Sequence, residues 1–387
     1  MATPLSASSF CGRAFGLLAV GSPPHLPHTF AVRQSVHVAE KVWTTEDGGR
    51  VLSARPLREA RLLHFGNNEG HRREYQELLG PLFDLAPVTG KVGSQNILAL
   101  LRARSVLFGT IDDHYIGFLT VALLRVILGL RTVGLFLRPQ TCFKTDGSLR
   151  RTLKGWFFTG LKRVQGISVC MITPVVFAPH YAHVARFGIM DPHMWDKGVQ
   201  LIRAHDSDLA DLVIEQSHGR RILAFVGSVT QIKGIEFLMA LLNRPEWPED
   251  KFFVVVAGKV AAELADPLQR ISRSRALVID RRISDLELDT LYVCSEWIWA
   301  CYRPDYDQSS GIFGRALQFG KIPVVRRGAQ INHIASKLGL SAIRLDFGEI
   351  DLALNEFARA GGGGIVADEA MVARWRNDFI QTVNSLL

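Results

Sequence analysis

Short apolar runs recur from residue 61 onward, separated by polar turns and by segments with helical spacing. The runs that we predict to be strands in the first half of the chain are 62–65, 105–109, 132–137 and 166–173. Between them, 71–79 and 115–129 have the length and apolar content of helices. Because strands alternate with helices, we expect a parallel sheet covered by helices, the arrangement of a doubly wound α/β domain.

The same rhythm starts afresh after a turn-rich segment, 190–198, and we place the link between two domains at roughly residue 195. The second half has predicted strands at 221–227, 252–257 and 277–279, and helices at 235–242 and 284–291. Ser284 suits the start of the last helix, because its hydroxyl can accept a hydrogen bond from a first-turn N–H. The pattern therefore predicts two α/β domains of similar size.

The pattern divides the chain into four parts. Residues 1–58 are rich in Ser, Ala, Pro and His, and we expect a poorly ordered N-terminal extension there. We assign 59–195 to a first Rossmann-like domain, 196–365 to a second one, and 366–387 to a C-terminal helix.

The segment from Asp307 to Val325 is the most informative stretch of the second half. An apolar run at 291–302 precedes it and another opens at Ile322, so that the predicted helix at 310–319 lies between two strands and ends at Gly320. Hydroxyls and a small residue stand where this helix would begin, at Ser309, Ser310 and Gly311. Unpaired N–H groups at a helix N-terminus suit a phosphate. An ordinary capped βαβ crossover without a ligand is the alternative.

Composition narrows the class of protein. The 387 residues are 48% hydrophobic and 21% charged, which indicates a folded globular chain, and the net charge of +8 favours anionic ligands. No basic run interleaved with aromatics appears, so we expect no nucleic-acid partner. The five cysteines form no CxxC pair, which argues against zinc and disulfides and favours a reducing, cytoplasmic setting.

The segment from Tyr115 to Gly129 is the most apolar of the chain and is interrupted only by Arg125. It is shorter than the about 20 residues of a membrane-spanning helix, so a helix buried against the sheet is favoured. Peripheral contact with a membrane and an ordinary solvated basic face both stay open, because basic residues follow at Arg138, Lys144, Arg150, Arg151, Lys154, Lys162 and Arg163.

Three groups of residues carry a resemblance to a known family: Phe225-Val226-Gly227 through Lys233-Gly234, Phe253 through Ala257-Gly258, and 283–292 with 302–325. Together they resemble the GT-B glycosyltransferases, in particular the retaining, nucleotide-sugar-dependent family that includes sucrose synthase and bacterial polysaccharide transferases. The resemblance implies two Rossmann-like domains facing a central cleft, with the acceptor on the first, the donor on the second, and a C-terminal helix crossing back to the first.

The resemblance also implies roles for individual residues. The family's first acidic position, which handles the donor sugar, falls on Asp307, whereas its second, which usually holds the ribose, falls on Arg315. The loop arginine of the family is replaced by Ser228, after Gly227. Lys233, with the Ser309, Ser310 and Gly311 turn, would stabilise the charge on the leaving diphosphate. Asp112 and Asp113 are adjacent and so do not form the D-x-D metal motif of the other main glycosyltransferase architecture. We therefore expect no required metal and no cofactor.

On the acceptor side, His114 is the first choice for a base that receives the acceptor's proton. The expected function is transfer of a sugar from a nucleotide diphosphate donor to a saccharide or lipid-linked acceptor, in surface polysaccharide or glycoconjugate synthesis. The resemblance favours retention of configuration but leaves the outcome open. A nucleotide-sugar epimerase or hydrolase of the same fold and a non-catalytic binding protein remain as alternatives, the last because of Arg315 and Ser228.

Overall fold

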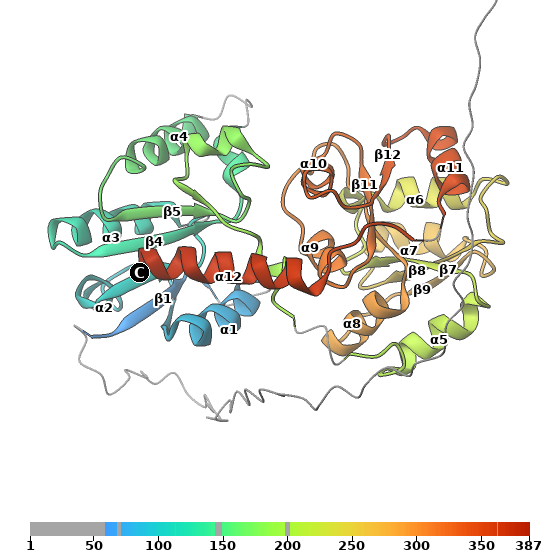
Figure 1. Ribbon diagram of the computed structural model, residues 1–387, viewed down its shortest axis with the longest axis horizontal. Coiled ribbons are helices and arrows are strands. Elements are labelled where there is room, and N and C mark those ends of the chain that lie inside the picture. The colour runs from blue at the N-terminus through green and yellow to red at the C-terminus, as the bar shows by residue number, and fades with distance from the viewer. Residues whose placement is uncertain (1–58, 68–70, 113, 144–148, 198–201, 362) are drawn as a thin grey trace, which may run out of the picture. The chain divides into compact units, whose positions relative to one another are not determined.

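The computed structural model describes residues 59–387 except 68–70, 113, 144–148, 198–201 and 362. The proposed extension 1–58 lies outside the described residues. Two six-stranded parallel sheets, each flanked by helices, make up the described chain, and both belong to one compact unit (Figure 1). The α/β architecture expected from the alternating pattern is therefore confirmed.

The first sheet has the strand order β2-β1-β3-β4-β5-β6, so the order reverses between β1 and β3. Its strands are β1 (Arg61–Phe65), β2 (Ala86–Thr89), β3 (Ser105–Phe108), β4 (Arg131–Phe136), β5 (Ile167–Met171) and β6 (Phe187–Gly188). The helices of this half are α1 (His71–Phe83), α2 (Ile97–Arg102), α3 (Tyr115–Ile127) and α4 (Leu149–Leu161).

The second sheet has the order β12-β11-β10-β7-β8-β9 and reverses between β7 and β10. Its strands are β7 (Arg221–Val226), β8 (Phe252–Ala257), β9 (Ala276–Ile279), β10 (Trp297–Ala300), β11 (Ile322–Arg326) and β12 (Ile343–Leu345). The helices that follow these strands or flank the sheet are α5 (Asp208–Ser217), α6 (Ile235–Leu242), α7 (Ala262–Gln269), α8 (Asp285–Cys294), α9 (Gly311–Gln318), α10 (Gln330–Lys337) and α11 (Ile350–Arg359). Ligands bind such sheets at the carboxyl ends of the strands where the order reverses.

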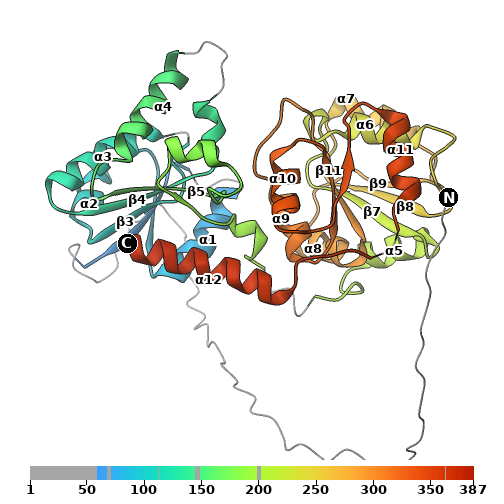
Figure 2. The same cartoon turned by 45° about the horizontal axis from the view of Figure 1, so that its top comes forward.

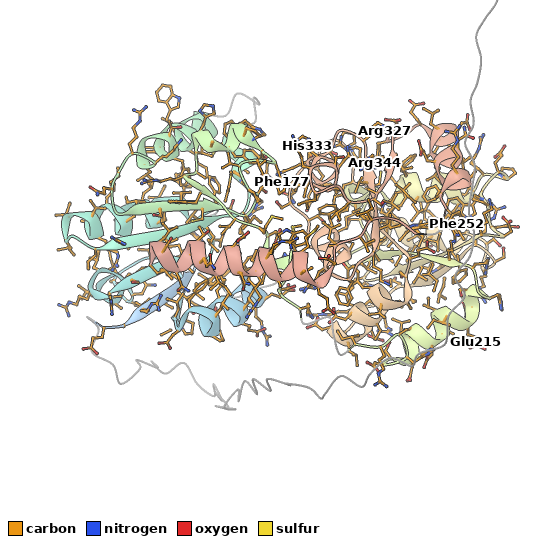
Figure 3. The ribbon with its side chains drawn as sticks, in the orientation of Figure 1. Phe177, Glu215, Phe252, Arg327, His333 and Arg344 are labelled. Atoms are coloured by element: carbon orange, nitrogen blue, oxygen red, sulfur yellow. The ribbon has the colours of Figure 1, made fainter. Side chains whose placement is uncertain are left out.

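Apolar side chains fill both faces of each sheet, as expected for parallel strands covered by helices. All six residues of β8 are buried. One of them, Phe252, is labelled in Figure 3 within the second domain. The centroid of its ring lies 4.5 Å from that of Trp297 on β10.

The C-terminal helix α12 (Glu369–Leu386) packs on the first domain, which confirms the expected return of the chain. The centroid of its Phe379 ring lies 6.1 Å from that of Phe83 on α1 and 4.8 Å from that of Trp195. The hydroxyl of Ser105, at the start of β3, donates to the carbonyl of Leu387.

The apolar segment 115–129 forms a helix, but the expectation that the sheet buries it holds for one side only. Phe118, Val121 and Ala122 of α3 are buried, whereas Ile116 and Ile127 are exposed. A sequence that is apolar all round the helix gives no sign of which side faces outward. No helix in the described part of the chain combines the length and the apolar content needed to cross a membrane.

Candidate functional site

A cavity of about 550 Å³ lies at the carboxyl ends of strands from both sheets. The first domain contributes to its wall Arg72, Glu74, Tyr75, Thr110, Leu137, Arg138, Ile172, Asp191 and His193. The second domain contributes Val226, Gly227, Ser228, Lys233, Asp285, Leu288, Tyr292, Tyr302, Tyr306, Gln308, Ser309, Ser310, Gly311, Ile312 and Arg315. The volume is in the range of small-molecule and cofactor pockets. Seven of the nine site residues predicted from the sequence therefore line one space.

The N-terminus of α9 opens onto this cavity. Ser310 is its N-cap: the hydroxyl accepts from the amide of Phe313 at 3.2 Å and lies 2.6 Å from the hydroxyl of Tyr302. Within the described residues, the first-turn amides of Gly311 and Ile312 have no hydrogen-bond partner. The serine hydroxyl is thus used by the helix itself, and the backbone amides are the donors left for an anion.

Lys233 projects into the same cavity from a short turn after β7. The indole N–H of Trp299 donates to the Lys233 carbonyl at 3.1 Å and fixes the backbone of this turn. The ammonium lies 3.1 Å from the point where a Cβ on Gly227 would stand, and Ile312 of α9 lies 3.6 Å from that point. Gly227 has a φ of 86°, which favours glycine, so the lysine and the amino end of α9 meet over a backbone without a side chain.

The charge of Lys233 is not compensated by the protein. Among the described residues its ammonium has no hydrogen-bond or ion-pair partner. Burial lowers its pKa from 10.5 to about 8, because the charged form loses water without gaining a carboxylate. A half-buried ammonium without a carboxylate partner can hold an anion.

Arg315 also lines the cavity, but its charge is already paired. Its guanidinium donates to Glu74 of α1 and to Asp196 of the interdomain link, both at 3.2 Å. Burial alone would lower the pKa of Arg315, and the carboxylates of Asp196 and Glu74 outweigh this and raise it. Carboxylates therefore occupy this arginine, where an arginine in such a cavity could also have bound a phosphate.

Asp307 and His114 are not among the residues that line the cavity, and the catalytic roles expected for them stay predictions. The Asp307 carboxylate accepts from the amide of Gln330 at 2.8 Å, at the start of α10. The N-cap of that helix is Ala329, which has no acceptor of its own, so the aspartate takes over capping. The imidazole of His114 lies against the backbone of Gly66, where a Cβ would be 1.9 Å from the ring.

A buried group that the sequence did not single out centres on His193. Its ring lies 3.0 Å from Asp191 through Nδ1 and 3.3 Å from Glu74 through Nε2, and the hydroxyl of Tyr75 donates to Asp191. Burial would lower the pKa of His193, but the adjacent Asp191 carboxylate outweighs it and raises the pKa to about 10. The ring is 3.3 Å from the position of a Cβ on Gly311, so the side chain of His193 lies against the start of α9.

Among the described residues, no group of three or more His, Cys, Asp or Glu side chains is arranged to hold a metal ion.

Comparisons with known proteins bear on the fold. No protein-family model matches the sequence, and no curated protein matches it. Two crystal structures of HepE from Anabaena are similar to this chain. The one with UDP and glucose has a TM-score of 0.52 and 12% identity, covering 85% of this chain and 95% of HepE. The one with UDP-glucose has a TM-score of 0.51 and 12% identity, covering 82% and 85%.

WaaG, described as a glycosyltransferase involved in lipopolysaccharide biosynthesis, aligns with a TM-score of 0.44 and 10% identity over 84% of this chain and 94% of WaaG. The similarity to HepE, together with the two parallel sheets and their strand order, shows that the chain has the GT-B fold.

Proposed function

We propose that the chain is a glycosyltransferase, which moves a sugar from a nucleoside diphosphate donor to a saccharide or lipid-linked acceptor. The observation that carries the proposal is the half-buried ammonium of Lys233, which has no partner among the described residues, beside the unpartnered amides of Gly311 and Ile312. The leaving group of such a reaction is a nucleoside diphosphate, whose negative charge grows as the glycosidic bond breaks. A cation and oriented amides in a partly dry cavity stabilise that charge.

The proposal assigns the diphosphate to the space above Gly227, between Lys233 and the start of α9. Ser228 is exposed beside this space and offers a hydroxyl, a weaker partner than the arginine of the resembled family. His193 lies under the same helix end, but Asp191 and Glu74 already pair with its ring, so Lys233 is the cation that the proposal uses. We infer that these groups do the work without a required metal.

The acceptor's proton needs a base, and neither Asp307 nor His114 lines the cavity to provide one. Glu74 does line it, but its carboxylate holds Arg315 and His193. We propose that a phosphate oxygen of the leaving group takes the proton, which corresponds to a retaining reaction.

Uridine diphosphate sugars are the first donors to test, because the HepE structures hold UDP with glucose and UDP-glucose. We propose a cytoplasmic setting as well. The cysteines in the described part of the chain are free thiols, which fits a reducing compartment.

Two measurements test the proposal. The melting temperature should rise with a nucleoside diphosphate from a panel of UDP, GDP, ADP and CDP, and Lys233→Ala should abolish most of the rise. The control is Lys251→Ala, which removes an exposed lysine of the same domain. No shift with any nucleotide in the parent protein would contradict a donor site.

The second measurement follows release of the nucleoside diphosphate with and without saccharide and lipid-linked acceptors, with the product anomer read by NMR. Acceptor-dependent release supports the transferase, and an α product from an α donor supports retention. Release that needs no acceptor would instead identify a hydrolase or epimerase.

A further inference from the structure

Exposed apolar side chains are concentrated in one part of the first domain. Of the seventeen large apolar side chains that are exposed in the described part of the chain, eleven lie between Leu98 and Val176. The other six are scattered over the second domain and the segment after it. Single exposed apolar residues are ordinary, but a contiguous set marks an interaction surface.

Helix α3 presents such a set along its outer side. Ile116, Leu123 and Ile127 follow one another at spacings of seven and four residues, which places them on one face of a helix. Ile116 is 62% exposed and Ile127 is 80% exposed. Phe118 and Val121, on the opposite side, are fully buried. A helix that only covers a sheet would have polar residues outside, so the outer stripe needs another explanation.

Helix α4, which lies beside α3, also has apolar side chains on both its buried and its exposed side. Leu153, Trp156 and Phe157 are exposed, with 73% of Trp156 accessible, whereas Phe158 and Leu161 are buried. The buried sides of α3 and α4 belong to the same core cluster on one side of the first sheet (Figure 2). Their outer stripes therefore face away from the sheet on the same side of the domain. We call these exposed residues of α3 and α4, with Leu124 and Leu128, the α3–α4 face.

The part of the chain that carries the α3–α4 face is rich in basic residues. From 91 to 190 the sequence has thirteen lysines and arginines against three aspartates and no glutamate, although Arg125 and Lys154 among them are buried. At the amino edge of the sheet, where α2, α3 and α4 end or the next strand begins, the exposed basic side chains are Arg102, Arg104, Arg131 and Arg163.

We propose that the α3–α4 face binds the surface of an anionic lipid bilayer. Apolar stripes on two neighbouring helices enter the boundary between headgroups and acyl chains, with Trp156 suited to that boundary, and the arginines contact the headgroups. A second copy of the chain is the poorer partner, because two such faces would bring like charges together.

The position of the α3–α4 face also agrees with a lipid-linked acceptor, and this part of the argument rests on the proposed function. In a parallel α/β domain the helices begin at the carboxyl edge of the sheet, where the cavity lies. The stripe of α3 begins at Ile116, one turn from that edge, and a lipid-linked acceptor resting in the bilayer would reach the cavity from there.

The test uses the full chain and sedimentation with lipid vesicles. Vesicles of phosphatidylcholine containing roughly one third phosphatidylglycerol should bind it, pure phosphatidylcholine should bind it less, and raising salt should weaken binding, since salt screens the headgroup charge. Ile127→Asp and Trp156→Asp should each lower binding at least about tenfold. Leu352→Asp, at an exposed apolar position of α11, is the matched control and should bind like the parent.

Two results would overturn the proposal. One is vesicle binding by both aspartate variants that equals the parent. The other is a dimer in sedimentation velocity that both variants disrupt, with no binding of the parent to vesicles, which would make the face a contact between copies. Melting-temperature shifts with soluble nucleotide should persist in both variants, so that a failure of membrane binding is distinguished from a failure of the donor site.

Discussion

Replacing Lys233 by methionine should change the stability of the free protein and its affinity for nucleotide in opposite directions. Methionine keeps the length and apolar stem of the lysine and removes only its charge. In the free protein the Lys233 pKa is about 8 rather than 10.5, so at neutral pH the charged lysine lowers the free energy of unfolding by about 3 kcal/mol. Because the ammonium has no partner to compensate this cost, K233M should raise the melting temperature of the free protein.

The same replacement should weaken binding of a nucleoside diphosphate. A hydrogen bond between charged groups contributes about 1.5–3 kcal/mol, so we expect the dissociation constant to rise by about 10- to 150-fold. Titration calorimetry at pH 7 measures this, with K251M as the exposed control. A lower melting temperature of K233M without nucleotide, or an unchanged dissociation constant, would refute the reasoning.

The lowered pKa of Lys233 also determines how stability and nucleotide binding change with pH. Between about pH 8 and 10.5 the unfolded chain binds a proton at Lys233 that the folded chain has lost, so this residue adds stability to the free protein as pH rises through that window. Nucleotide binding is strongest with the ammonium and should weaken above pH 8, by about 7- to 25-fold from pH 7 to 9.5 for a charge that contributes 10- to 150-fold to the affinity. K233M should lose both trends, and calorimetry across this range measures them.

Other perturbations separate binding from stability. Gly227→Ala should weaken nucleotide binding, because the new Cβ lies 3.1 Å from the lysine ammonium. Gly219 has a similar positive φ but lies in open space, so Gly219→Ala should lower only the free energy of unfolding, by about 1 kcal/mol. Equal nucleotide affinity of the two variants would contradict this prediction. Arg315→Ala should lower the free energy of unfolding in urea by up to about 3 kcal/mol, because it leaves the carboxylates of Glu74 and Asp196 without this partner. Arg327 is exposed, so Arg327→Ala should lower the same free energy by less than about 1 kcal/mol. Similar losses for both arginines would argue against a buried pairing. Asp307→Ala should lose about 0.5–2 kcal/mol through the cap of α10 and keep its turnover; lost turnover with unchanged stability would restore a catalytic role.

Periodicity was sufficient to predict the sheets and most of the strands, because a continuous apolar run such as 252–257 has few other environments open to it. The capped helix near Ser310 and its stop at Gly320 follow from local chemistry and were predicted for the same reason. The direction of a side chain does not follow from local chemistry. The Asp307 carboxylate accepts from the amide of Gln330 at the start of α10, whose own N-cap, Ala329, has no acceptor, and no local pattern relates these residues, which are 23 positions apart.

The network around His193 shows a second limit of prediction from the sequence. Glu74 lies on α1 and Arg315 on α9, 241 residues apart, and they meet only when the two domains come together. The segment containing His193 has the composition of a turn, and a turn is what the sequence predicts there. The burial that raises its pKa is a property of the assembled chain.

The path of the chain restricts how the two domains can move. It passes between them twice, once after Trp195, which packs on Phe379, and once before α12. On the second-domain side, Lys197 pairs with Asp289 at 2.9 Å, and Ile365 exchanges hydrogen bonds with Ser341. A body attached at two points rotates most easily about the line that joins them, so opening of the cavity should be a rotation about one axis, with twisting about other axes resisted by the covalent backbone.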